Sequence, residues 1–214
     1  MKNLLLKEIK LTAQPLSFIF ISFALMTLVP QYPILVGAFF VCFGIFQTFQ
    51  KARECNDIIY SATLPIKKTD VVKTKFIFTI TIQAIAYLLM VVFAVLRMCL
   101  LNNYVPYSIN KLMNSNMVFL GFVLIIFALF NIVFVGGFFK TAYKIGVPFV
   151  LFIISAFLTI GVGEALHFFP TLDVLNYNYH YSHLIVLAIG ILVYAILTTL
   201  SYKKSKKNFS KIDL

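Results

Sequence analysis

The chain has 214 residues, of which 61% are hydrophobic and 12% are charged, and its formal net charge is +11. A soluble domain has close to half apolar residues and about a quarter charged residues, so this composition excludes an ordinary soluble protein. Apolar residues cover most of the chain, which leaves no room for a separate soluble catalytic domain. The composition therefore predicts an all-α, polytopic membrane protein.

Six long apolar segments follow one another in a single transmembrane domain, residues 1–214. The predicted spans are residues 16–30, 34–50, 75–101, 117–139, 145–166 and 184–202. The other predicted parts are an amphipathic helix at 1–14, a cytoplasmic coupling region at 51–74 and a basic cytoplasmic tail at 203–214. The first two spans are short against the roughly 20 residues that a helix needs to cross the hydrocarbon. Residues 11–13 could extend the first helix inward, and the second helix could continue into the cytoplasm.

The basic residues lie almost entirely on one side of this arrangement. Of the 18 Lys and Arg residues, only Arg97 and Lys111 fall in the stretches on the other side. Because excess Lys and Arg in short loops marks the cytoplasmic face, both termini are expected to be cytoplasmic. Lysines that border apolar segments of this length indicate contact with anionic lipid headgroups and not with nucleic acid.

The N-terminal segment has the pattern of a helix that lies on the membrane surface. Leu5, Ile9 and Thr12 share one helical face, and the neighbouring lysines can reach the headgroups. Pro15 is expected to turn the chain into the bilayer.

Cysteine and histidine residues give no clear site. The three cysteines, Cys42, Cys55 and Cys99, have no C-x-x-C spacing, and we interpret them as buried small side chains. His180 and His183 form an H-x-x-H pattern that could bind a metal if their loop folded back, but histidines at a membrane interface are far commoner. We therefore expect neither a metal nor a cofactor.

Two ionisable residues lie near the outer ends of predicted spans. Arg97 is in the third span and Glu164 is in the fifth. Charges inside a membrane usually face a bundle interior, a cavity or each other, so these two side chains could form an ion pair or line a substrate pathway. Alternatively, both could reach the outer headgroups.

The segment between the second and third spans is the most specific part of the sequence. Cys55, Ile58, Ile59 and Ala62 recur at the spacing of one apolar helical stripe. Glu54, Asp57 and Ser61 lie on another face of the same predicted helix. Leu64 and Pro65 are expected to end it, because the residue before a proline is disfavoured in a helix. Positive-inside bias explains the lysines nearby but not this pattern.

This segment resembles the cytoplasmic signature of the type-2 family of ATP-binding-cassette transporter permeases. The residues that carry the resemblance are Glu54 with Asp57, Leu64-Pro65-Ile66, Lys67-Lys68, Val71-Val72 and Lys73 to Lys75. The chain is most similar to small six-span bacterial permeases that export peptides, bacteriocins or toxins, or protect against them. Such a protein would lie in the plasma membrane of a bacterium.

The resemblance implies a coupling helix that docks on a separate cassette ATPase, of which two copies would bind ATP and magnesium. The implied contact residues are Glu54, Asp57, Ile58, Ser61, Leu64 and Pro65. A second permease copy, in a homodimer or a heterodimer, would complete the pathway. The chain has no G-x-x-x-x-G-K-[ST] phosphate loop, so we do not expect it to be an enzyme. The alternative functions are a self-protection transporter of this family and a free-standing channel or anchor. The alternative for the segment between the second and third spans is an amphipathic helix that only rests on the membrane.

Overall fold

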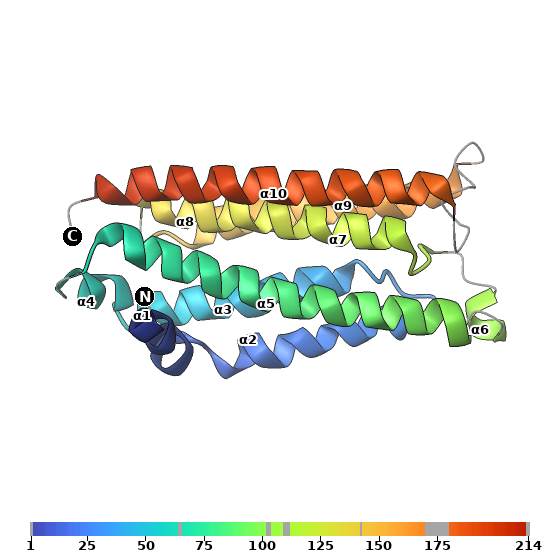
Figure 1. Ribbon diagram of the computed structural model, residues 1–214, viewed down its shortest axis with the longest axis horizontal. Coiled ribbons are helices and arrows are strands. Elements are labelled where there is room, and N and C mark those ends of the chain that lie inside the picture. Colours follow the sequence, from blue (N-terminus) through green and yellow to red (C-terminus); the bar gives the residue numbers. More distant parts are fainter. Residues whose placement is uncertain are drawn as a thin grey trace.

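The computed structural model describes residues 2–63, 66–101, 104–108, 112–141, 143–169 and 180–212, and every element in these ranges is a helix. Figure 1 shows an elongated bundle in which α2, α3, α5, α7, α9 and α10 run along the long axis. Both termini and α4 lie at one end, and α6 lies at the other. We call the first of these the lysine-rich end. The helices are α1 (Lys2–Lys7), η1 (Glu8–Thr12), α2 (Pro15–Ile19), η2 (Phe20–Leu28), α3 (Val36–Glu54), α4 (Asp57–Thr63), α5 (Lys68–Leu96), η3 (Arg97–Leu101), α6 (Val105–Ser108), α7 (Met117–Leu129), η4 (Phe130–Val135), α8 (Gly136–Thr141), α9 (Gly146–Ala165), η5 (Leu166–Phe168) and α10 (Tyr181–Ser210).

The N-terminal helix is separate from the helix that follows it. Ala13 and Gln14 are extended, and Pro15 stands at the start of α2, where its missing N–H costs nothing. The axes on the two sides of this break differ by 88°. The expectation that residues 11–13 lengthen the first span is therefore wrong, because the extended backbone at Ala13 ends the helix.

The short first span is stretched by its helix type. Nine residues, Phe20–Leu28, form the 3₁₀ helix η2, although 3₁₀ runs longer than about 4 residues are uncommon. A 3₁₀ helix rises about 2.0 Å per residue against about 1.5 Å in an α-helix, so α2 and η2 together extend about 25 Å instead of about 21 Å. The unusual geometry brings this segment closer to the thickness of the hydrocarbon.

The second predicted span continues past residue 50, as expected for a helix that extends beyond the hydrocarbon. Helix α3 runs to Glu54, and Asn56 then adopts a left-handed conformation with φ 50° that turns the chain into α4. Asn tolerates this conformation better than most residues do. The expectation of one unbroken apolar stripe from Cys55 to Ala62 is wrong, since Cys55 lies outside α4.

Four described helical segments are long and apolar enough to cross a membrane: Lys68–Leu101, Met117–Thr141, Gly146–Phe168 and Tyr181–Ser210. A fifth is added if the two helices on either side of the 88° break count as one span. The described part of the chain is thus all-helical and holds four or five candidate spans, and the sixth span stays a prediction. The expected basic tail is helical to Ser210, so it extends the last helix instead of hanging free.

Helices α7 and α10 pack closely where two glycines meet. A Cβ atom built on Gly190 would lie 2.6 Å from the carbonyl oxygen of Gly121, and one on Gly121 would lie 2.8 Å from the carbonyl oxygen of Val186. No side chain fits at these distances, so the two backbones touch. Small residues permit such close approach of helices in a membrane.

A buried amide pair ties α5, η4 and α10 together in the middle of the bundle. Gln83 Nε2 donates to Asn131 Oδ1, and Asn131 Nδ2 donates back to Gln83 Oε1, both at 3.0 Å. Asn131 Nδ2 also donates to Thr198 Oγ1, and the hydroxyl of Tyr194 donates to Gln83 Oε1. Asn131 lies in the π-helical turn η4, a helix type often found at functional sites. Here the amides satisfy each other and fix three helices in register.

Candidate functional site

Four charged side chains meet inside the protein at the lysine-rich end. Lys75 of α5 pairs with Glu8 of η1, and its Nζ lies 3.2 Å from Oδ2 of Asp57 in α4. Lys7 of α1 pairs with the other carboxylate oxygen of Asp57 and donates to Ser61 Oγ at 2.7 Å. We call Lys7, Glu8, Asp57 and Lys75 the charge cluster. It connects the N-terminal helix, α4 and the first long span.

The charge cluster is withdrawn from water. Glu8, Asp57 and Lys75 are only 3%, 6% and 2% exposed. A buried charge is costly unless it is paired, and removing one partner of a buried pair typically costs about 3–5 kcal/mol. The two lysines and two carboxylates balance, so each charge depends on the others. The three helices are therefore held as one mechanical unit.

The ionisation of Asp57 follows from these contacts. Burial alone would raise the pKa of the Asp57 carboxyl, but the nearby ammonium groups of Lys75 and Lys7 outweigh it and hold the pKa below its usual range. Asp57 is therefore a carboxylate at neutral pH.

Local structure places each member of the cluster. Lys7 and Glu8 are adjacent at the junction of α1 and η1, and Asp57 is the first residue of α4 after the left-handed turn at Asn56. The ammonium of Lys75 also lies 5.7 Å from the ring centre of Phe49, so α3 packs against the cluster as well. This cation–π contact adds a fourth helix to the unit.

The expected ATPase-contact residues divide into three groups in the structure. Asp57, Ile58 and Ser61 are buried against the rest of the chain, at 6%, 6% and 2% exposure, so they do not present a free surface. Glu54 is exposed and accepts a 3.0 Å hydrogen bond from Gln50. Leu64 and Pro65 lie outside the described residues.

The exposed face of α4 includes two large side chains that are not among the implied contact residues, although Ile59 belongs to the predicted apolar stripe. Ile59 and Tyr60 are 52% and 56% exposed. In the structure Asp57 and Ser61 face Lys7 of the N-terminal helix and Lys75, so contact of these two residues with a partner stays a prediction. A protein that docks on α4 would meet Ile59 and Tyr60.

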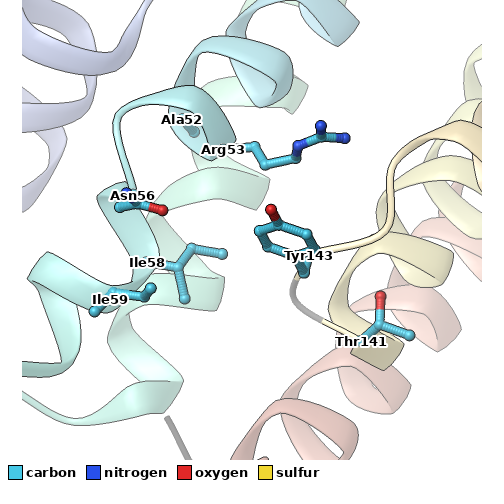
Figure 2. A pocket seen from close by; sticks show the side chains of 7 residues that line it. All are labelled: Ala52, Arg53, Asn56, Ile58, Ile59, Thr141 and Tyr143. Atoms are coloured by element: carbon cyan, nitrogen blue, oxygen red, sulfur yellow. The ribbon is translucent and has the colours of Figure 1, made fainter.

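A small notch of about 80 Å³ opens beside this face. Figure 2 shows Ile58 and Ile59 on one side of it and Thr141 and Tyr143 on the other, with the Arg53 side chain reaching toward Tyr143. The guanidinium of Arg53 lies 5.3 Å from the ring centre of Tyr143. The notch is mainly apolar and lies between α3 and α4 on one side and the end of α8 with the segment that follows it on the other.

Sequence reasoning missed Glu8 and Lys75 and misplaced Lys7. Glu8 is the only acidic residue among the first 53, in a segment otherwise populated by lysines, which was a usable signal. Lys75 follows Val71 and Val72 at the spacing of the buried face of α5, where an unpaired lysine would not be stable. Lys7, expected at the lipid headgroups, faces Asp57 instead.

Arg97 and Glu164 have different partners. Arg97 donates to the carbonyl oxygen of Thr27 at 2.9 Å, and its guanidinium lies 5.1 Å from the ring centre of Tyr107. Glu164 accepts a 2.9 Å hydrogen bond from the backbone N–H of Met113. Within the described ranges neither side chain makes an ion pair, so the structure does not bring these two charges together. Each instead ties a span to a segment at the outer end of the bundle.

The histidines do not form a metal centre in the part of the chain that the structure describes. No group of three or more His, Cys, Asp or Glu residues there could hold a metal ion. The ring of His180 instead accepts from the backbone N–H of Ser182 and caps α10.

Comparison with protein-family models gives one match, over residues 3–210, to a family described as ABC-2 family transporter protein. The chain belongs to the ABC-2 transporter family. This match covers nearly the whole described fold, including the charge cluster and α4. No curated protein and no solved structure matches the chain.

Membership of the ABC-2 family agrees with the four or five apolar candidate spans, and the chain is an integral membrane protein. Members of this family are membrane components that normally work with a cassette ATPase. The question that the geometry raises is how such a partner could act on this chain.

Proposed function

We propose that this ABC-2 family member is the six-span permease subunit of an ATP-driven exporter, with its lysine-rich end in the cytoplasm. Two cassette ATPases would bind there, and a second permease copy, identical or similar, would complete the pathway. The observation that carries the proposal is the charge cluster, which fixes the exposed helix α4 to α5 and to the N-terminal helix. A rigid link of this kind is what a mechanical coupling element needs.

In this proposal α4 is the coupling helix. The ATPase contacts Ile59, Tyr60 and Glu54, which are exposed, and the notch beside Tyr143 receives a side chain of the partner. An apolar centre with an aromatic anchor is typical of binding hot spots. Asp57 does not touch the partner but attaches the helix to Lys75.

Closure of the two ATPases would push α4, and the charge cluster would pass that displacement on. Lys75 lies in the second turn of α5, which runs without a break to Leu96, so a shift at its first turns moves the whole helix. Glu8 and Lys7 would carry the N-terminal helix along. The push would then reach α2 through the short extended segment at Ala13 and Gln14.

The cargo that we propose is an amphipathic peptide, toxin or antimicrobial. Helix α9 exposes a large apolar face, which includes Val150, Leu151, Ile154, Phe157 and Leu158. If two copies meet near this face, the pathway between them is lined by aliphatic and aromatic side chains. Such walls suit an amphipathic chain better than a sugar. Export and self-protection would use the same pathway and the same coupling.

Copurification tests the proposal. The tagged chain should retain a cassette ATPase in mild detergent, and replacing the docking surface by the double change Ile59→Ser and Tyr60→Ser should release it. The matched control is Tyr104→Ser, which alters a similarly exposed tyrosine directly before α6, the helix at the opposite end of the bundle.

Two outcomes would count against the proposal, and a third would invalidate the assay. A free-standing channel or anchor would be active without any ATPase. A surface helix that only rests on the membrane would give the same ATPase recovery with and without the double change. Loss of the ATPase in the Tyr104→Ser control would show that the assay reports general damage.

A further inference from the structure

A groove opens between α5 and α10 near the lysine-rich end of the bundle. Its volume is about 260 Å³. Phe76, Ile77 and Ile80 of α5 form one wall, and Thr199 and Tyr202 of α10 contribute to the other. Both helices are candidate membrane spans, so this groove faces lipid and not water.

Both threonine hydroxyls of the groove wall are hydrogen-bonded within the protein. Thr199 Oγ1 donates to the carbonyl oxygen of Ala195 at 2.7 Å, and Thr198 Oγ1 accepts from Asn131. The rest of the lining is mainly apolar, with the side chains of Phe76, Ile77 and Ile80 and the ring of Tyr202. A hydrocarbon chain packs favourably against such walls, whereas a polar ligand would lose its hydration there without gaining hydrogen bonds.

One end of the groove is cationic. Lys73 lines it, exposed, one turn of α5 before the apolar wall begins. Lys206 is exposed one turn beyond Tyr202, at the helical spacing that continues the same face of α10. The carboxylate nearest in sequence is Asp70, and Lys68 of the same turn donates to the carbonyl oxygen of Ile212. The mouth of the groove thus keeps a positive balance.

The apolar wall runs from the lysines toward the middle of the membrane. Ile80 stands seven residues beyond Lys73, about 10 Å along the helix axis. A phospholipid has this same polarity: a phosphate at the membrane surface and an acyl chain below it. Basic pockets between membrane helices on the side that carries excess lysine are known to bind anionic headgroups.

We propose that the groove binds one anionic phospholipid of the leaflet at the lysine-rich end. Its phosphate lies between Lys73 and Lys206, and one acyl chain lies along Phe76, Ile77 and Ile80. Free phosphate offers nothing to the apolar wall, and a zwitterionic lipid gains less from the two lysines. The site is independent of ATPase docking, because the groove lies between α5 and α10 and not on α4.

The test is lipid retention by the purified chain, measured by native mass spectrometry in detergent. Phosphatidylglycerol and phosphatidylcholine with the same acyl chains are titrated separately. A lysine near the membrane surface contributes about fivefold in affinity for an anionic lipid, so two lysines give phosphatidylglycerol an advantage of about 25-fold. The change Lys73→Ala should lower phosphatidylglycerol binding about fivefold and lower phosphatidylcholine binding by a smaller factor.

Two further variants separate a built site from general attraction. Thr199→Trp fills the groove and should weaken both lipids, while Lys144→Ala removes an exposed lysine that does not line the groove and should change neither. The thermal stability of each variant in lipid-free detergent shows whether it is folded. Equal affinity for the two lipids would overturn the proposal, as would equal losses from Lys73→Ala and Lys144→Ala. Unchanged binding in the folded Thr199→Trp variant would place the lipid elsewhere and overturn it too.

Discussion

Removal of the Lys75 ammonium should detach the N-terminal helix from the bundle. The change Lys75→Met replaces lysine with an unbranched apolar side chain one atom shorter and leaves Glu8 and Asp57 buried with only Lys7 as a counter-ion. Breaking a buried pair typically costs about 3–5 kcal/mol, and we take the lower figure because the cluster lies close to the membrane surface. At 1.36 kcal/mol per factor of ten, a loss of about 3 kcal/mol raises the equilibrium constant for detachment of the N-terminal helix about 150-fold.

The opening can be measured by thiol labelling at a buried position of the N-terminal helix. Thr12 is 3% exposed in the closed structure, so a Thr12→Cys variant reacts with a maleimide mainly when the helix opens. The exposed Cys55 and Cys99 are changed to Ser, and the buried Cys42 stays. We expect labelling about 150-fold faster when Lys75→Met is added.

Two control variants test whether faster labelling results from the charge imbalance within the cluster. Adding Asp57→Asn to Lys75→Met restores the balance of one cation and one anion, and labelling should slow by about tenfold or more. Lys73→Met removes an exposed lysine from the same helix and should change nothing. If Lys75→Met accelerates labelling less than about threefold, or if Lys73→Met acts equally, the cluster does not hold the helix.

Three further predictions concern stability and pH. Gly190→Val should lower the stability of the detergent-solubilised protein by about 1–3 kcal/mol in a thermal melt, since its Cβ would lie 2.6 Å from a backbone oxygen of α7. The control Gly161→Ala, whose Cβ would have nothing within 4 Å, should lower it by less than about 0.5 kcal/mol. Equal losses from the two changes would contradict the close packing of α7 and α10. Asn131→Leu leaves Gln83 without its amide partner and should cost about 0.6–1.7 kcal/mol in the same melting assay, and an unchanged midpoint would show that the pair is energetically neutral. The pKa of Asp57 is lowered in the folded chain, so its contribution to stability is fully present above the unfolded pKa of about 3.9 and is lost as the pH falls through the lower native pKa. The maleimide labelling rate of the Thr12→Cys variant, corrected for the pH-dependent fraction of thiolate, should therefore stay constant from about pH 8 to 5. A rise of the corrected rate as the pH falls within that window would contradict the pairing of Asp57.

The broad architecture could be predicted from the sequence because it depends on composition and on long-range patterning. Apolar length gave the later spans, whose candidate helices begin and end within a few residues of the predicted bounds at Met117 and Gly146. The resemblance in residues 51–75 identified the transporter family, which the family match confirms. The span positions and the family resemblance can be predicted because they do not depend on how individual side chains pack.

Helix type and helix breaks were less predictable. Nothing in the composition of Phe20–Leu28 distinguishes a 3₁₀ helix from an α-helix, because the choice depends on the tertiary surroundings. The left-handed turn at Asn56 divided a pattern that reads as one amphipathic helix. Local propensity is a weak guide where a single backbone conformation redirects the chain.

The charge cluster was missed because its members are spread over 68 positions, from Lys7 to Lys75. Positive-inside counting treats every lysine as a surface group, whereas Lys75 is 2% exposed. Asp57 was predicted to contact a partner, and its pairing with Lys7 and Lys75 was not foreseen, since a carboxylate that attaches to a partner and one that attaches to its own chain look alike in sequence. Only the fold distinguishes these two roles.

The transport stoichiometry of the reconstituted complex tests the central proposal most directly. Proteoliposomes would contain the chain and its cassette ATPase, and the peptide moved per ATP hydrolysed would be compared between the wild type and Lys75→Met. If the charge cluster transmits the push, ATP hydrolysis stays within about twofold while peptide transport falls about tenfold or more. Unchanged transport, or a fall of transport and hydrolysis in equal proportion, would contradict coupling through the cluster.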